Sequence, residues 1–389
     1  MSDIRLSANW NYPTAIRAGA GRVRELPSLC FEYGIRAPLL VTDPGLASLP
    51  MISNILNHCE ENGLRVQMFA NIKGNPSGEN VTEGLTVFRS GEHDGVLAVG
   101  GGSALDAAKA IALMAGQTRP LWDFEDEGDN YLRVNEDAMA PVIAVPTTAG
   151  TGSEVGRSSV ITDEYAKIKR IIFHPKMLPA QVILDPELTI GLPANITAAT
   201  GMDALSHNLE AWCAPNFHPM AEGIALEAMR LISVYLPRAV ADGGDLAARM
   251  QMLVASSMGA TAFQRGLGAM HALAHPLGAL YDAHHGLLNA ILMPYVLKAN
   301  AEAIGEPMDR LSRYLDLPQR GCNGVLDWVL RLRSDLKIPH TLEEIGIGAD
   351  RAEQVGKMAA ADPAAGSNPI AFSAEDYSHI FAEACRADA

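Results

Sequence analysis

Short apolar runs alternate with helical patterns in the first half of the chain, and this alternation most constrains the fold. Each run is almost entirely apolar and stops at Gly, Pro or Asp, which is typical of a buried strand. The runs are residues 38–42, 66–70, 95–100, 141–146 and 182–185. Helical patterns lie between some of them, over residues 51–63 and 103–116. Such alternation predicts a parallel sheet covered by helices on both faces.

The pattern changes after about Leu192. From there Ala, Leu and Met recur at helical spacing, and strand-like runs almost vanish. The clearest helical stretches are residues 196–212, 220–236 and 248–263. Two prolines and a glycine interrupt residues 184–196, which indicates a boundary. We therefore predict an α/β domain over residues 1–190 and an all-helical domain over residues 191–389.

Composition and charge exclude several classes of partner. The chain has 389 residues, 48% of them hydrophobic, which suffices for a large core. A net charge of −15 repels nucleic-acid phosphates and anionic lipid, so neither is expected as a partner. The first residues do not resemble a signal peptide, and the apolar runs are too short to span a bilayer. Five scattered cysteines without a CxxC pair fit the cytoplasm.

A glycine-rich loop follows the strand predicted at residues 95–100. Three glycines, Gly100–Gly102, and Ser103 lead directly into a helical pattern. Glycines allow a ligand to approach the backbone closely, and the free N–H groups of a helix start suit a pyrophosphate. Lys109 either adds positive charge in that helix or faces solvent. The simpler alternative is a tight strand–helix turn without a ligand.

A second loop, residues 146–155, strengthens the case for a nucleotide site. It follows another predicted strand and concentrates small hydroxyl residues among glycines. These residues are Thr147, Thr148, Thr151 and Ser153. Two such loops at the carboxyl ends of strands in one sheet fit a nucleotide crevice, although each alone could be an ordinary polar turn. The lysine pattern of nucleoside triphosphatases is absent, so triphosphate hydrolysis is not indicated.

Asp43 ends the first predicted strand, where a carboxylate could accept a hydrogen bond from a ribose hydroxyl. It precedes the glycine loop, whereas the usual dinucleotide fingerprint places the acidic residue about 20 residues after it. The earlier glycines in residues 19–26 lack the third glycine of that fingerprint and predict only a turn. The strand order should therefore differ from that of an ordinary Rossmann domain.

Histidines concentrate in residues 268–286, which hold four of the eleven in the chain. His271 and His275 are four residues apart, so they share one face of a helix. A histidine on an apolar helix is usually a core residue with satisfied hydrogen bonds. Four in so short a stretch, beside Gly and Pro, favour a functional site.

Asp203 and His207 have the same four-residue spacing farther upstream. They form either a metal platform or a plain pair on a helix surface. We expect helix-borne His271 and loop-borne His285 to meet them around one cation. Three imidazoles and one carboxylate suit Zn²⁺ or Fe²⁺, whereas Mg²⁺ and Ca²⁺ prefer oxygen ligands.

The two predicted sites together indicate a reaction class. A cation beside a nicotinamide can bind an alcohol oxygen and lower the pKa of its hydroxyl, or polarise a carbonyl in the reverse direction. The cofactor then carries the hydride, while the protein orients the reactants.

Four motifs together resemble the iron-containing (group III) alcohol dehydrogenases. They lie at residues 100–109, 146–155, 201–212 and 271–286, in that family's order and spacing, and the resemblance extends over essentially the whole chain. It implies an α/β cofactor domain, a helical domain and a metal in the cleft between them. The implied activity is NAD-linked, reversible oxidation of small primary alcohols or diols to aldehydes. The implied metal is Fe²⁺, with Zn²⁺ as the alternative, and the implied assembly is a dimer or larger homo-oligomer.

The resemblance also assigns roles to residues. The implied metal ligands are Asp203, His207, His271 and His285. His285 is preferred to the adjacent His284 because it lies fourteen residues after His271, as in the family. His275 matches a family histidine near the nicotinamide that could relay a proton, so we assign catalytic roles to His275 and His271.

Cofactor contacts are implied at nine positions. They are Asp43, Asn75, Gly101, Gly102, Ser103, Thr147, Thr148, Ser153 and Lys169. The carboxylate of Asp43 would repel a 2′-phosphate, so NAD is expected rather than NADP.

The chain departs from the family pattern at two positions, one that bears on the substrate and one that bears on the choice of metal ligand. Arg157 stands where family members often carry a small residue, and His284 replaces a common proline. If Arg157 or Lys167 faces the substrate, a small hydroxy acid such as 4-hydroxybutyrate becomes the alternative to a neutral alcohol. A maleylacetate-reductase-like member is a further alternative, but retention of four ligands argues against it. A metal or nucleotide sensor without turnover is the alternative outside the enzymes.

Overall fold

The computed structural model describes residues 11–386, which divide into two compact units. The sheet unit comprises residues 13–191, and the helical unit comprises residues 192–386 together with residues 11 and 12. The boundary between the two units follows Gly191.

The sheet unit contains a six-stranded, fully parallel sheet with the order β1-β8-β5-β4-β2-β3. Its strands are β1 (Ala15–Ala18), β2 (Pro38–Val41), β3 (Gln67–Phe69), β4 (Gly95–Gly100), β5 (Val142–Pro146) and β8 (Gln181–Leu184). The five strands predicted from apolar runs are confirmed. The order reverses between β2 and β4, the arrangement of doubly wound folds such as flavodoxin, and differs from the ordinary Rossmann order as expected.

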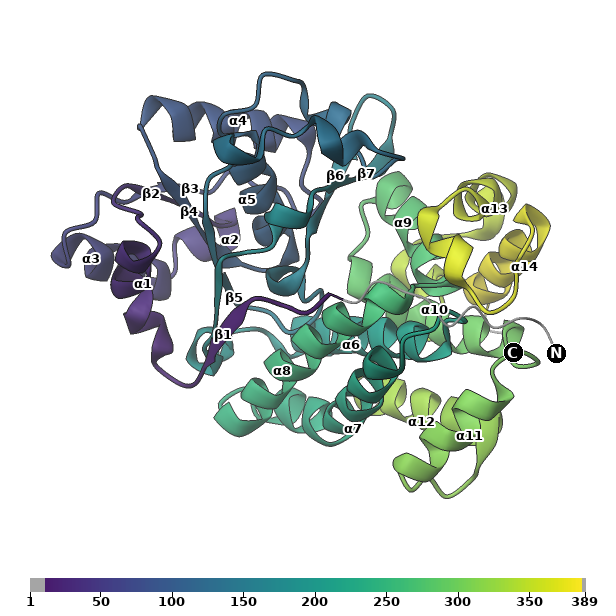
Figure 1. Cartoon of the computed structure of the whole chain (residues 1–389). Helices are drawn as coiled ribbons and strands as arrows, with labels where there is room; N and C mark the ends of the chain where they lie inside the picture. Colours follow the sequence, from purple (N-terminus) through teal and green to yellow (C-terminus); the bar gives the residue numbers. More distant parts are fainter. Residues whose placement is uncertain (1–10, 387–389) are drawn as a thin grey trace. The chain divides into compact units, whose positions relative to one another are not determined.

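Helices cover both faces of this sheet, as predicted (Figure 1). On one face, α1 (Leu26–Glu32) and α3 (Pro50–Glu61) pack on inward-facing strand residues such as Leu40 and Val99. On the other face lies α5 (Gly102–Met114), with α4 (Gly78–Ser90) packed against it. A short helix, α2 (Pro44–Ala47), follows β2. Burial on both faces explains why β2, β4 and β5 carry no polar side chain.

A two-stranded antiparallel hairpin, β6 (Ser158–Asp163) and β7 (Ile168–Phe173), was not predicted. Strand β6 is buried only at alternate positions and β7 is mostly half-buried. Both strands mix polar with apolar residues, so no apolar run marks them. The edge strand β1 escaped prediction for the same reason, since most of its residues are exposed.

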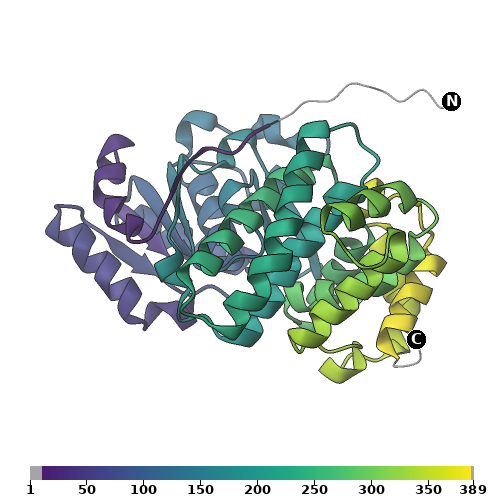
Figure 2. The ribbon, with the colours of Figure 1, turned by 90° about the horizontal axis from the view of Figure 1, so that it is seen from below.

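In residues 192–386 the structure describes only helices and connecting segments, which confirms the predicted all-helical half. The helices are α6 (Ala194–Cys213), α7 (Pro219–Ala241), α8 (Leu246–Ala262), α9 (Ala269–Tyr281), α10 (His285–Ala299), α11 (Gly305–Tyr314), α12 (Gly321–Asp335), α13 (Ala352–Ala360) and α14 (Ala374–Cys385). Helices α6, α7 and α8 lie side by side (Figure 2).

Helix α6 is the centre of this unit. It contacts α7, α8 and α10, and nearly all its side chains from Thr197 to Trp212 are buried. Apolar residues on every side of a helix require burial on every side, so polar residues within it need partners inside the protein. No helix in the described part of the chain is both long enough and apolar enough to cross a membrane.

Candidate active site

The carboxyl ends of β2 and β4 bring Asp43 beside the glycine loop. The Asp43 side chain caps α2, with Oδ1 accepting a hydrogen bond from the Leu46 N–H at 3.0 Å. A Cβ atom at Gly100 would lie 3.5 Å from the other carboxylate oxygen of Asp43. Ligands of doubly wound sheets bind at the point where the strand order reverses, which here lies between these two strands.

The two predicted cofactor loops touch each other. The Thr147 N–H donates to the Gly100 carbonyl at 3.0 Å. A Cβ at Gly102 would lie 2.5 Å from Thr151, and one at Gly101 would lie 3.4 Å from Thr148. Glycine at position 102 is therefore required by the close approach of the second loop as well as suited to a ligand.

Lys109 and Asp106 on α5 form hydrogen bonds with the second loop and with the start of β6. The buried Lys109 ammonium donates to the carbonyls of Ser153 and Ser158, while Asp106 accepts from the Ser153 hydroxyl and the Val160 N–H. Burial lowers the pKa of Lys109, against the opposing effect of Asp106. Contrary to our expectation, Lys109 neither faces solvent nor stands free to meet a phosphate, because loop carbonyls surround it. The Ser153 hydroxyl likewise has a partner within the protein, because it donates to Asp106 on α5.

The remaining predicted cofactor residues meet around residues 74–75. Lys169 on β7 donates to the Asn75 side-chain oxygen at 2.9 Å, and the Ser103 hydroxyl donates to the Gly74 carbonyl. Three segments far apart in the sequence thus converge near the start of α5.

Arg157 and Lys167, the two cations considered for substrate choice, have different surroundings. The Arg157 guanidinium lies over the Phe173 ring at 5.6 Å from its centroid. Burial raises the pKa of the nearby Asp126 carboxyl, and the charge of Arg157 opposes that rise. Lys167 lies in the turn of the β6–β7 hairpin with a φ of 55°.

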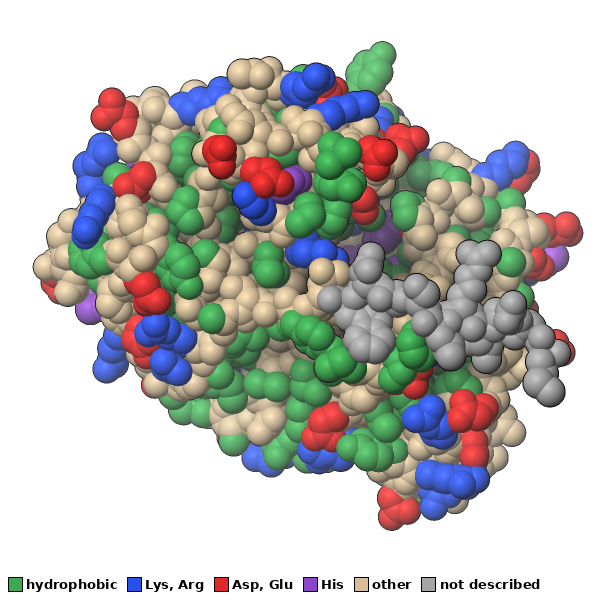
Figure 3. All heavy atoms as spheres, viewed as in Figure 1, with side chains coloured by type: hydrophobic (Ala, Val, Ile, Leu, Met, Phe, Trp, Pro, Cys, Tyr) green, Lys and Arg blue, Asp and Glu red, His purple; other side chains and the backbone are tan. Residues whose placement is uncertain are grey.

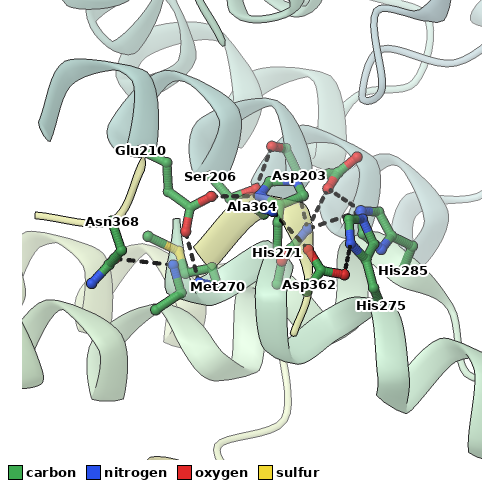
Figure 4. A network of polar contacts seen from close by, with 12 residues as sticks. Asp203, Ser206, Glu210, Met270, His271, His275, His285, Asp362, Ala364 and Asn368 are labelled. Carbon is green, nitrogen blue, oxygen red and sulfur yellow. Dashed lines mark hydrogen bonds and ion pairs between the residues drawn. The ribbon is translucent and has the colours of Figure 1, made fainter. Parts of the chain in front are cut away.

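The predicted metal ligands come together inside the helical unit. Figure 4 shows three of them, Asp203, His271 and His285. One ligand atom from each of Asp203, His207 and His271 lies within 4.8 Å of the others, and all three residues are buried. The His285 Nε2 atom lies 3.7 Å from Asp203 Oδ1. Three imidazoles and one carboxylate at this spacing fit a single Zn²⁺ or Fe²⁺ ion.

The expectation that His285 lies in a loop is wrong, because it is the first residue of α10. His284 is the cap of that helix, where its Nδ1 accepts from the Leu287 N–H at 3.3 Å. The neighbouring imidazoles thus have different surroundings, and it is His285 whose ring lies beside Asp203.

Two family models match the chain in succession. The model of iron-containing alcohol dehydrogenases matches residues 13–186, and the C-terminal model of the same family matches residues 197–385. The chain belongs to the iron-containing alcohol dehydrogenase family. It is therefore an alcohol oxidoreductase, as its sequence motifs predicted.

Relatives of this alcohol dehydrogenase match along their whole length. It is 40% identical to the 4-hydroxybutyrate dehydrogenase of Cupriavidus necator, over 94% of this chain and 97% of the relative. It is 35% identical to the NAD-dependent methanol dehydrogenase of Bacillus methanolicus, over 97% of this chain and 99% of the relative. A solved structure of a 1,3-propanediol oxidoreductase is 34% identical, with a TM-score of 0.90, covering 97% of this chain and 100% of that one.

Three residues that contact the predicted site residues were missed from the sequence. Glu210 on α6 lies 2.6 Å from His271 Nδ1, and Asn289 on α10 donates to Asp203 Oδ1 at 2.8 Å. Asp362 lies 2.9 Å from His275 Nδ1 (Figure 4). Spacing offered a signal for two of them, since Glu210 is seven residues after Asp203 and Asn289 is four after His285, each on a shared helix face. Asp362 lies 87 residues from its partner and gave no local signal.

The electrostatics of the cluster are dominated by buried carboxylates. Burial lowers the pKa of His271, but the charges of Glu210, Asp203 and Asp362 outweigh that effect and raise it above the usual value. The His275 ring stacks on that of His285 with centroids 5.5 Å apart. The site therefore concentrates negative charge around the imidazoles, which favours a bound cation.

Proposed function

We propose that this chain is an NAD-linked, metal-dependent dehydrogenase that reversibly oxidises small primary alcohols or diols to aldehydes. The observation that carries the proposal is the close group of three histidines and one aspartate within a single unit, in which Asp203, His207 and His271 are buried and His285 is half-buried. Membership of the family and the alcohol and diol relatives support the same reaction class.

Asp203, His207, His271 and His285 would hold the metal, which we propose to be Fe²⁺, with Zn²⁺ as the alternative. When bound, such an ion supplies Lewis-acid chemistry at the substrate oxygen. The protein supplies the fixed arrangement, since Asp203 and His207 share one face of α6 and His271 projects from α9. Asn289 donates to Asp203 and holds its carboxylate in place.

NAD is the proposed cofactor, and the glycine loop with the second hydroxyl-rich loop is its proposed site. Contacts are proposed from Asp43, Asn75, Gly101, Gly102, Ser103, Thr147, Thr148, Ser153 and Lys169. The location of Asp43 beside Gly100, at the reversal of strand order, supports this assignment. A carboxylate at that point favours a ribose hydroxyl over a 2′-phosphate.

His275 is the proposed proton-transfer residue, and His271 acts as a metal ligand. Asp362 binds His275 at Nδ1, so the neutral ring carries its proton there and presents the lone pair of Nε2. An Nε2 atom in that state can accept a proton from the alcohol side of the reaction and return it in the reverse direction.

A small hydroxy acid is the second candidate substrate, because the 4-hydroxybutyrate dehydrogenase is 40% identical to this chain. Arg157 is the proposed cation for the substrate carboxylate. Arg157→Ala should then raise the KM for 4-hydroxybutyrate at least tenfold more than the KM for 1,3-propanediol. Equal changes in the two KM values would remove Arg157 from substrate recognition. A maleylacetate-reductase-like activity remains disfavoured because the four ligands are retained.

A homo-oligomer of at least two chains and a cytoplasmic location complete the proposal. All five cysteines are free thiols, as expected of a protein in a reducing compartment. Size-exclusion chromatography with light scattering tests the assembly.

A substrate panel tests the proposed activity. Absorbance of NADH would be followed with methanol, ethanol, 1,3-propanediol and 4-hydroxybutyrate, with Fe²⁺ or Zn²⁺ added back to metal-stripped protein. We expect metal-dependent reduction of NAD by at least one neutral alcohol or diol. Reduction by 4-hydroxybutyrate alone would favour the second candidate, and absence of turnover with metal bound would favour a sensor.

A further inference from the structure

A buried glutamate joins the two helices that carry most of the proposed metal ligands. Glu210 lies on α6 three residues after His207, and its side chain is 4% exposed. Its Oε2 lies 2.6 Å from the Nδ1 of His271, while its Oε1 accepts from the Met270 N–H at 2.7 Å. Both carboxylate oxygens therefore engage α9, one at a ring and one at the backbone (Figure 4).

The start of α9 depends on side chains from elsewhere in the fold. Gly268, at its N-cap, has no side chain to cap the helix, so the first N–H groups need other acceptors. Asn368 accepts from the Ala269 N–H at 3.0 Å, and Glu210 accepts from the next. A Cβ at Gly268 would lie 2.8 Å from Asn368 Oδ1 and 3.0 Å from Glu210 Oε1. The absence of a Cβ atom at Gly268 therefore allows Asn368 and Glu210 to approach the first N–H groups of α9.

We propose that Glu210 is a positioning residue of the metal site, which sets the place of α9 and the orientation of the His271 ring. The inference rests on the proposed function, because it concerns how that site is held. A carboxylate at Nδ1 keeps the ring proton on that nitrogen and leaves the Nε2 lone pair for a metal. Glu210 is not itself a ligand, since Oε1 and Oε2 are both engaged by α9.

Glu210→Gln tests the role with little change in shape. The glutamine carbonyl can accept from one of the two donors, either His271 Nδ1–H or Met270 N–H, but not from both. When its NH₂ group faces His271, the ring must move its proton to Nε2, which blocks metal binding. Outer partners of metal-bound histidines typically contribute about 10–100-fold in metal affinity. We expect a loss in that range.

The measurement is Zn²⁺ affinity of metal-stripped protein, by competition with a chelating dye, together with the visible spectrum after Co²⁺ is added. Asn368→Ala is the matched control, because it removes the other acceptor at the start of α9 without touching His271. Asn368→Ala should lower the melting temperature yet keep Zn²⁺ affinity within about threefold of wild type. Glu210→Gln should weaken Zn²⁺ binding and alter the Co²⁺ bands.

The possible outcomes separate this inference from the proposed function. If wild-type protein binds neither Zn²⁺ nor Co²⁺, the proposed metal site itself fails. If wild type binds and Glu210→Gln binds equally, or if Asn368→Ala loses affinity to the same extent, the positioning role is overturned. If Glu210→Gln fails to fold, nitrogen-15 NMR of the imidazoles in Zn²⁺-loaded wild type tests the proposal instead. We expect a proton on Nδ1 of His271, and the absence of that proton would contradict the proposal.

Discussion

Asp43 serves the fold and the proposed cofactor site through separate atoms. One oxygen caps α2, and the other lies beside Gly100. A cap needs only an acceptor, whereas discrimination against a 2′-phosphate needs a negative charge. The two properties can therefore be separated by one substitution.

Asp43→Asn keeps an effective N-cap and removes the charge. We expect the ratio of kcat/KM for NADP to that for NAD to rise about tenfold, equivalent to about 1.4 kcal/mol. Initial rates with each cofactor check this. Glu60→Gln, an equal charge change at an exposed position on α3, is the control and should leave the ratio unaltered. An unchanged ratio in Asp43→Asn would contradict the assignment of Asp43.

Residues whose roles depend on neighbours in sequence were predictable, and those whose roles depend on distant contacts were not. The Asp203–His207 pair and the His271–His275 pair show their shared faces through helical spacing. Lys109 does not reveal its burial, because the carbonyls that bind it come from Ser153 in the second loop and Ser158 at the start of β6. Asp362 meets His275 only through the packing of segments 87 residues apart.

At the level of elements, the proposed metal site depends on the close approach of α10 to α6. A Cβ at Gly286 would lie 2.5 Å from the carbonyl oxygen of Ala199 and 2.9 Å from Asp203 Cβ. Backbone cannot move aside as the end of a flexible side chain can. Glycine next to His285 therefore allows the imidazole of α10 to reach the carboxylate of α6.

Gly286→Ala should separate the two helices, weaken Zn²⁺ binding at least tenfold and destabilise the protein by about 1–3 kcal/mol. Gly223→Ala is the matched control, because an added methyl on α7 meets nothing within 4 Å. Gly223→Ala should leave the free energy of unfolding unchanged or raise it by up to about 1 kcal/mol, since alanine is the better helix former. Zn²⁺ competition and thermal melting would measure both variants, and equal metal affinity in the two would contradict this account.

Burial also explains which elements could be predicted. Strands β2, β4, β5 and β8 are buried at every position, so they read as apolar runs. Strand β1 lies at the sheet edge and exposes most of its residues, so AIRA carries no such signal. Helices α6, α7 and α8 were recognised from their spacing, although sequence could not show that α6 is enclosed by its neighbours.

On the scale of the whole molecule, the two units bear different parts of the proposed function. All four proposed metal ligands lie in the helical unit, and all proposed NAD contacts lie in the sheet unit. Acidic and basic side chains are intermixed over the face in Figure 3, despite the net charge of −15. Because the two proposed sites lie in different units, a ligand that binds one of these sites should stabilise its own unit first.

If the proposed metal is bound, its removal should loosen the helices that carry its proposed ligands. A ligand that binds only the folded state stabilises it, by about 2.7 kcal/mol when present at 100 times its Kd. With EDTA we expect faster amide hydrogen exchange in α6, α9 and α10, and unchanged exchange in β2, β4 and β5. Peptide-resolved mass spectrometry measures this, with EDTA saturated by Ca²⁺ as the control. Faster exchange confined to the sheet unit would contradict the placement of the metal.

Thiol reactivity should follow burial in both units. Burial raises the pKa of Cys30 to about 12 and that of Cys59 to about 11. Because the thiolate is the reactive form, few of these thiols are ionised at pH 8, and their reaction should accelerate only as the pH rises toward those values. We expect both to resist iodoacetamide at pH 8 in native protein and to react in guanidinium, whereas half-buried Cys322 reacts sooner. Peptide mass spectrometry measures the order, and rapid native labelling of Cys30 would contradict it.

The most direct test of the central claim measures metal content and NAD reduction together, on protein purified without oxygen. Wild type should contain one metal ion per chain and reduce NAD with an alcohol, and His271→Ala should lose both. His284→Asn is the matched control, because asparagine can still cap α10 and His285 is left intact, so metal and activity should persist. Full activity in metal-free wild type, or in His271→Ala, would show that these histidines do not form a catalytic metal site.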